Sequence, residues 1–427
     1  MRFILGFLYS FLMARIVPVL IKLLTPRFSL AVGVVGFYGW LYFSQWWLLK
    51  IQNNIGGGRN YVDLASVLNA AQCFERIGDS VYSTVETCGF QYGIFLLRFI
   101  QFFNLDSANL ELLGGILVVS AFLILLGIGM YSVKTRYQAK IAFFLTISPG
   151  PWLLFERGNF DLLIIILVTL GTLFLNSRFS ILTVFFITLS ALMKFYTLPL
   201  LLLYIVIEKR TYLRAVAAAA IVLVTPIILY DISRAPSFPN PTFVAFGLPS
   251  PGLWLNFFAW RFEVPIEFSG PLLYLIGSLV FFIGVYFIYF SSLRHKFSSG
   301  FLPSPTVSPF SRNVFLVSSG LYLSCFLAGM NYDYRLYFLI VSLLLLNQIF
   351  PDFRESRLFL ILQISALWAT VFFFGIDGPI HVLLAMFGNF CQLLLAIYLL
   401  GAMYRLLESP ASFKWVVQLP NKIFRKA

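Results

Sequence analysis

The chain has 427 residues, of which 60% are hydrophobic and only 11% are charged, whereas a soluble domain carries about 25% charged residues. This composition excludes a water-soluble globular protein. Apolar stretches recur along the whole chain, and a stretch of about 20 residues is long enough to cross a hydrocarbon core of about 30 Å. We therefore predict one all-α, polytopic membrane domain.

The net charge of +13 fits a membrane protein better than a nucleic-acid-binding protein. No basic run is interleaved with polar recognition residues, so nucleic acid is not an expected partner. Lys and Arg in the loops of a membrane protein hold those loops in the cytoplasm and lie against anionic lipid. Membrane lipids are therefore expected partners.

The apolar stretches predict about twelve transmembrane helices. Their ranges are 29–50, 110–133, 141–156, 160–176, 180–193, 195–208, 213–230, 270–292, 313–330, 334–350, 358–375 and 382–404. With the N-terminus inside, the Lys and Arg residues of the inner loops all fall on the cytoplasmic side. Both termini are then cytoplasmic, in a multi-pass protein of a plasma or inner membrane.

The predicted membrane domain, 29–404, has a distinct segment at each end. Residues 1–28 are expected to form an amphipathic N-terminal segment, because charged residues and a proline interrupt its apolar stretch. Residues 405–427 form a basic cytoplasmic tail.

Two long segments fall on the exoplasmic face. In residues 51–109, the stretch Tyr92–Phe103 is too short to span a membrane, so it is expected to be a helix that lies at the interface or packs on the bundle. Residues 231–269 are rich in proline and aromatic residues and resist regular helix, which suggests a lid or a lipid-facing wall.

Asp63 is the first candidate for chemistry. It follows the first predicted span and the glycines 56–58, which let the chain turn sharply near the membrane surface. A carboxylate in a partly desolvated pocket can act as a general base on a hydroxyl. The alternative is that Asp63 caps the helix predicted over 64–76.

Cys73 and Cys88 lie in the same exoplasmic segment. They form either a disulfide that fixes the segment or two separate buried thiols. Tyr82 lies between them among acidic residues, but no His is near and the acids show no ligand spacing. A metal site is therefore not expected.

Three polar residues share a short turn between two predicted spans. Arg157 can place two donors on a phosphate, Asn159 can bind a hydroxyl, and Asp161 lies at the start of the next helix. The alternative is a simple ion pair between Arg157 and Asp161.

Two further sites carry cations in apolar surroundings. Lys194 lies between two short spans, where Tyr196 and Pro199 are typical of a broken helix that faces a cavity. Arg335 follows Asp333 in a second exoplasmic turn, and an ion pair between these two is the alternative reading.

Together, Arg157, Lys194 and Arg335 place three cations on one face of the bundle, which implies an anionic, phosphorylated ligand. His381 and Asp377 form a weaker cluster on the same face. Motifs for soluble nucleotides, for serine hydrolases and for zinc proteases do not occur.

These motifs, in this order along the chain, resemble the polytopic glycosyltransferases of the GT-C superfamily. The residues that carry the resemblance are Asp63, Gly78-Asp79-Ser80-Val81-Tyr82, Arg157-Gly158-Asn159-Phe160-Asp161, Lys194-Phe195-Tyr196 with Pro199, and Asn331-Tyr332-Asp333-Tyr334-Arg335-Leu336. Within the superfamily, the chain is most similar to the family eighty-seven mannosyltransferases that use polyprenyl-phosphate-mannose.

The resemblance implies an inverting transfer of a hexose, with mannose as the first candidate, from a polyprenyl-phosphate-linked donor to a lipid or glycan acceptor at the exoplasmic face. It makes Asp63 the general base and assigns the donor phosphate to Arg157, Lys194 and Arg335. Contacts with sugar or acceptor would come from Tyr82, Asn159, Asp161, Tyr196, Asp333 and His381. No metal or cofactor is expected.

Several alternatives stay open at this point. Pro199 and the run Gly89–Gly93 depart from the pattern of the relatives, which leaves the sugar and the acceptor undecided. Asp161 and Asp333 are rival bases. A transporter or flippase of a lipid-linked sugar or another amphipathic anion would share the spans and the cations, and a non-catalytic scaffold is a third reading.

Overall fold

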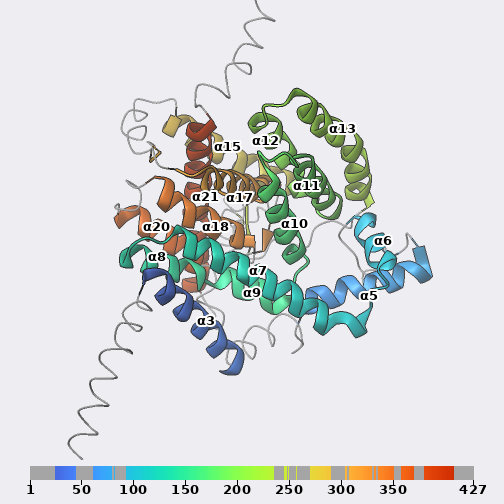
Figure 1. Ribbon diagram of the computed structural model, residues 1–427, viewed down its shortest axis with the longest axis horizontal. Coiled ribbons are helices and arrows are strands. Elements are labelled where there is room, and N and C mark those ends of the chain that lie inside the picture. Colours follow the sequence, from blue (N-terminus) through green and yellow to red (C-terminus); the bar gives the residue numbers. More distant parts are fainter. Residues whose placement is uncertain are drawn as a thin grey trace, which may run out of the picture.

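The computed structural model shows a bundle of helices with one very small sheet (Figure 1). It describes residues 25–44, 61–78, 81, 93–234, 245–247, 249, 256, 270–289, 303–304, 307–328, 331–332, 335–350, 357–369 and 379–407. The predicted all-α class is confirmed for this part of the chain.

The first half of the described chain contains helices α3 to α13. They are α3 (Pro26–Ser44), α5 (Val62–Ile77), α6 (Ile94–Phe102), the 3₁₀ turn η3 (Ser107–Asn109), α7 (Leu110–Ser132), α8 (Arg136–Thr146), α9 (Pro149–Arg157), α10 (Asp161–Phe174), α11 (Ile181–Met193), the 3₁₀ turn η4 (Phe195–Thr197), α12 (Pro199–Ile207) and α13 (Thr211–Arg234).

The second half contains the remaining helices and the two strands. They are β1 (Ala245–Phe246), α15 (Gly270–Tyr289), α17 (Pro309–Ala328), β2 (Asn331–Tyr332), α18 (Leu336–Ile349), α20 (Arg357–Trp368) and α21 (Pro379–Leu407). Strands β1 and β2 pair antiparallel, with Ala245 opposite Tyr332. This pair joins the Pro-rich segment 231–269 to the turn that precedes Arg335.

Four helical stretches in the described part of the chain are long and apolar enough to cross a membrane: Ser107–Ser132, Thr211–Arg234, Pro309–Ala328 and Leu383–Leu407. Several shorter apolar helices, α10, α11, α18 and α20 among them, accompany these four. The structure therefore supports a membrane-embedded helical protein.

Helix α7 shows why such a sequence belongs in lipid. Its outer face presents Leu112, Ile116, Val119 and Leu123, each more than half exposed. The opposite face buries Leu117 and other apolar or small residues in the bundle. Because both faces are apolar, the helix has no side suited to water, which is typical of a membrane span.

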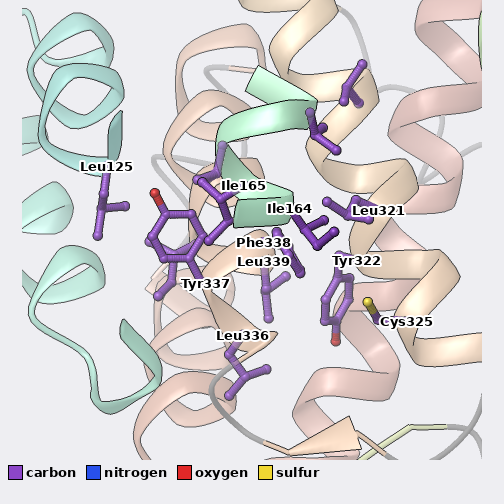
Figure 2. Packing of buried hydrophobic residues seen from close by; sticks show 14 of the residues in the cluster. Leu125, Ile164, Ile165, Leu321, Tyr322, Cys325, Leu336, Tyr337, Phe338 and Leu339 are labelled. Atoms are coloured by element: carbon purple, nitrogen blue, oxygen red, sulfur yellow. The ribbon is translucent and has the colours of Figure 1, made fainter. Parts of the chain in front are cut away.

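Helices α17 and α18 form the centre of the bundle. All residues of α18 except Gln348 are buried. Figure 2 shows Leu336, Tyr337, Phe338 and Leu339 of α18 packed with Leu321, Tyr322 and Cys325 of α17, Ile164 and Ile165 of α10, and Leu125 of α7. The Tyr337 hydroxyl donates to the Ala121 carbonyl of α7 at 2.8 Å, so α7 and α18 are joined within the core.

The single helix predicted over 141–156 is wrong. The chain forms α8 and α9 instead, with Ile147 and Ser148 between them. Proline at 149 and 151 lacks the N–H that a continuing helix needs, and it holds Ser148 in an extended conformation. The predicted break beside Lys194 is confirmed, since α11 ends at Met193 and α12 begins at Pro199.

The short helix predicted over Tyr92–Phe103 is confirmed as α6, which packs on the bundle. It buries Leu96, Leu97 and Ile100 and lies beside α5 at the edge of the molecule (Figure 1). Residues 1–24 and 408–427, most of the predicted N-terminal segment and tail, lie outside the described residues.

Candidate functional site

Asp63 is the second residue of α5 and does not cap that helix. Tyr61 occupies the N-cap position with left-handed backbone angles (φ 59°, ψ 39°). Its N–H donates to the Glu156 carbonyl at 2.9 Å, which ties the start of α5 to the last turn of α9. The capping alternative for Asp63 is therefore wrong, and the side chain is available for the site.

Two glycines make room for Tyr61. A Cβ atom on Gly114 of α7 would lie 2.6 Å from the Tyr61 ring, and one on Gly158 would lie 2.8 Å from the Tyr61 Cβ. Gly158 also ends α9 in the left-handed region (φ 56°), which favours glycine. The position of Asp63 thus depends on two backbones that approach Tyr61 closely.

We expect Gly158→Ala to destabilise the protein by roughly 1–3 kcal/mol, because alanine is strained at this φ and its Cβ meets Tyr61. Gly115→Ala is the matched control, since a Cβ there meets nothing within 4 Å. Thermal unfolding of the two purified variants in detergent measures the difference. Equal melting temperatures would contradict the role given to Gly158.

Asp63 makes an ion pair with Arg157 and a hydrogen bond with Asn159. Both Arg157 Nε and Nη2 donate to the carboxylate, with Nε 3.0 Å from Oδ2. Asn159 Nδ2 donates to the same Oδ2 at 2.6 Å. A forked guanidinium and an amide therefore orient the carboxylate.

Asn159 connects this pair to a second group of charges. Its Oδ1 accepts from the Asp161 backbone N–H and from Lys194 Nζ, each at 2.9 Å. The side chain is 1% exposed, so it serves as a buried bridge. An amide is suited to this role because it donates on one side and accepts on the other.

Asp161 is the centre of the second group. Lys194 Nζ lies 2.5 Å from its Oδ1, and Arg335 Nε donates to its Oδ2 at 2.9 Å. The Tyr196 hydroxyl also donates to Oδ1, and the Arg335 guanidinium lies 4.9 Å from the centre of the Tyr196 ring. Two cations and a phenol thus satisfy one buried carboxylate.

Helix ends bring these residues to one level of the bundle. Arg157 ends α9, Asp161 begins α10, and Arg335 precedes α18. Lys194 follows α11 with an extended backbone (φ −145°, ψ 113°) at the break before η4. The N–H groups at the start of α10 favour the negative charge of Asp161.

The network is sealed at one end and partly open at the other. The side chains of Lys194 and Asp161 are 2% and 1% exposed, whereas those of Arg157 and Asp63 are 22% and 14% exposed. The Arg335 side chain is 13% exposed. A ligand can therefore reach Asp63 and the two arginines, while Lys194 lies behind them.

The structure brings together seven of the predicted site residues: Asp63, Arg157, Asn159, Asp161, Lys194, Tyr196 and Arg335. The ion pairs considered from the sequence were Arg157 with Asp161 and Arg335 with Asp333. In the structure, Arg157 pairs with Asp63, and Asp161 pairs with Lys194 and Arg335. Tyr82 and Asp333 lie outside the described residues. His381 belongs to α21, but its side chain also lies outside them.

Cys73 is disulfide-bonded, as one of the two alternatives for the exoplasmic segment requires. Its predicted partner, Cys88, lies outside the described residues. Cys325 and Cys391 are buried thiols that form no disulfide. Within the described ranges, no group of three or more His, Cys, Asp or Glu side chains is arranged to hold a metal ion.

No protein-family model, curated protein or solved structure matches this chain.

Proposed function

We propose that this protein is an integral membrane glycosyltransferase. It transfers a hexose, with mannose as the first candidate, from a polyprenyl-phosphate-linked donor to a hydroxyl of a lipid or glycan acceptor, with inversion. The observation that carries the proposal is the connected network in which an oriented, partly exposed carboxylate, Asp63, lies beside cations suited to a phosphate.

The reaction uses Asp63 as general base. The carboxylate accepts the proton of the acceptor hydroxyl, whose oxygen then attacks the anomeric carbon of the donor sugar. The bond between that carbon and the phosphate oxygen breaks, and the polyprenyl phosphate leaves with the electron pair. A single displacement on one face of the sugar inverts its configuration.

Cations stabilise the charge that develops on the leaving phosphate. The hydrogen-bonded network holds three cations against two carboxylates, so it carries an excess of positive charge. Arg157 and Arg335 are the two cations that are partly exposed, and their planar guanidinium groups suit a phosphate. The leaving phosphate therefore meets two arginines.

Lys194 has a different role in this proposal. Its ammonium group is 2% exposed and contacts Asn159 and Asp161, so it positions these side chains behind the ligand. Asp161 and Tyr196 then hold Arg335 in place, and Asn159 holds Asp63, the partner of Arg157. Contacts of Tyr82, Asp333 and His381 with sugar or acceptor stay predictions.

The proposal includes the topology expected from the sequence. We expect about twelve spans in a GT-C-like arrangement, with both termini cytoplasmic and the site exoplasmic. The location of Asp63, Asp161 and Arg335 at the starts of α5, α10 and α18 supports one common site at one end of the bundle. A membrane-embedded site suits a donor whose carrier is itself a lipid.

Transfer of labelled mannose from polyprenyl-phosphate-mannose by the purified protein in liposomes tests this function. We expect Arg335→Gln to lower the rate at subsaturating donor by about 10²–10³-fold, as for loss of one donor to a developing oxyanion. The matched control is Arg98→Gln on α6, where Arg98 is exposed and packs on Phe74. An unchanged rate in Arg335→Gln would contradict phosphate binding by Arg335.

A further inference from the structure

A second site lies away from the polar network. A cavity of about 290 Å³ lies between helices α7, α10, α17 and α18. This volume is close to the lower end of the range for small-molecule pockets, about 300–1,000 Å³. From α7, the lining residues are Leu123, Ile124, Gly127, Ile128 and Tyr131, which form one continuous face of the helix.

The wall of this cavity is mainly apolar. Three buried hydroxyl groups of its lining already have partners, because Thr172 donates to the Val168 carbonyl at 2.7 Å, Ser318 to the Phe315 carbonyl at 3.2 Å and Tyr337 to the Ala121 carbonyl at 2.8 Å. Water gains few hydrogen bonds in such a space. Hydrocarbon is the ligand that this surface suits.

On the side of the bundle core, buried side chains close the cavity toward the polar network. Ile165, Leu321, Tyr337 and Phe338 line it there and are each 3% exposed or less, and Figure 2 shows all four in the packed core. The Phe338 ring lies 6.4 Å from that of Tyr196. Buried side chains therefore separate the cavity from the site around Asp161.

The cavity is open on the outer side of α7, where Leu123 is 57% exposed, and at the end opposite the polar network. Tyr131, Leu173 and Phe310 line the cavity at the far ends of α7, α10 and α17, and they are 36%, 56% and 38% exposed. An acyl chain can therefore lie in the cavity with its polar end at the end of the bundle that is remote from Asp63. The entrance faces the surroundings of the helices, which in a membrane are lipid.

The entrance is polar and cationic at its rim. The Tyr131 hydroxyl lies 2.7 Å from Ser308 Oγ. Arg27 Nε donates to the Val133 carbonyl at 3.0 Å, which places Arg27 at the end of α7. Both Arg27 and Lys134 act electrostatically on Tyr131, and the stretch 131–140 contains three cations and no acid.

We propose that this cavity binds one acyl chain of an anionic phospholipid, whose headgroup phosphate lies at the rim beside Tyr131, Lys134 and Arg27. The apolar wall, the opening toward the surroundings of the helices and the cations at the end remote from Asp63 together select this ligand. The site is independent of sugar transfer. It would fill the space between four helices that the protein itself leaves unfilled.

Native mass spectrometry of the protein released from nanodiscs of equal phosphatidylglycerol and phosphatidylcholine tests the proposal. Gly127→Phe fills the cavity, because Gly127 lies in the middle of the lining face and a Cβ there meets nothing within 4 Å. Gly115→Phe is the matched control on the same helix, with equally open space outside the cavity. If Gly127→Phe does not fold, Gly127→Leu places a smaller side chain in the cavity.

We expect the wild type and Gly115→Phe to retain phosphatidylglycerol in preference to phosphatidylcholine, and Gly127→Phe to retain at least tenfold less. Lys134→Glu, which changes an exposed residue, should also lower phosphatidylglycerol retention. Equal retention of phosphatidylglycerol by the filled variant would overturn the site. Equal retention of the two lipids by the wild type would contradict an anionic phospholipid as the ligand. Retention of a polyprenyl lipid in place of both would contradict it too.

Discussion

Replacement of Asp63 by Asn is expected to lower sugar transfer by about 10²–10⁴-fold, the usual contribution of a general base. Asn keeps the shape of the side chain and can still accept a hydrogen bond from Asn159, but it cannot take a proton from the acceptor. The loss should appear in the maximal rate, because Arg157 and Arg335 still bind the donor. Initial rates in liposomes at saturating donor measure it.

Asp106→Asn is the matched control for this variant. Asp106 belongs to the same predicted exoplasmic segment, and its carboxylate caps η3 by accepting from the Ala108 N–H at 2.9 Å. Since Asn caps a helix about as well as Asp, this variant should transfer sugar at the wild-type rate. Activity of Asp63→Asn close to that of Asp106→Asn would remove Asp63 as the base and leave Asp161 and Asp333 as candidates.

Asp161→Ala is expected to cost about 3–5 kcal/mol of stability, the usual effect of removing one partner from a buried ion pair. Lys194 is 2% exposed and would keep a positive charge with its carboxylate partner gone. Arg335 and the Tyr196 hydroxyl would lose the same partner. The variant should therefore show a much lower melting temperature than the wild type or accumulate poorly.

Two further variants test whether the lost stability comes from the broken ion pair or from the replacement of an Asp side chain as such. Asp106→Ala removes an exposed cap and should cost only about 0.5–2 kcal/mol. Asp161→Leu combined with Lys194→Met removes both buried charges, so it should be more stable than Asp161→Ala. Thermal unfolding in one detergent compares all three. A double variant no more stable than Asp161→Ala would show that the buried charge of Lys194 is not the cause.

Much of the fold is predictable from the sequence because each apolar helix appears there as a long, regular stretch of apolar residues. The ranges 110–133 and 213–230 correspond closely to α7 and α13. The break at Lys194 was also predictable, since a charge and Pro199 interrupt an apolar stretch. The division of 141–156 was missed because apolar content outweighed Pro149 and Pro151, although these prolines carried the signal.

The residue types in the sequence show which side chains belong to the candidate site, but they do not show which of these side chains pair with one another. Ionisable side chains are costly near a membrane, so Asp63, Arg157 and Arg335 stand out from the sequence. Their partners depend on the packing of helices far apart in the chain: Asp161 meets Arg335 across 174 positions. The role of Tyr61 depends on a left-handed backbone and two close glycines, for which the sequence has no pattern.

Sugar transfer by the purified wild-type protein tests the central claim most directly. The protein is placed in liposomes with polyprenyl-phosphate-mannose, labelled in the sugar, and a mixed pool of membrane lipids as acceptors. We expect a labelled glycolipid whose anomeric configuration is inverted relative to the donor, formed by Asp106→Asn but not by Asp63→Asn. Equal product from all three proteins, or a donor that crosses the bilayer unchanged, would contradict it.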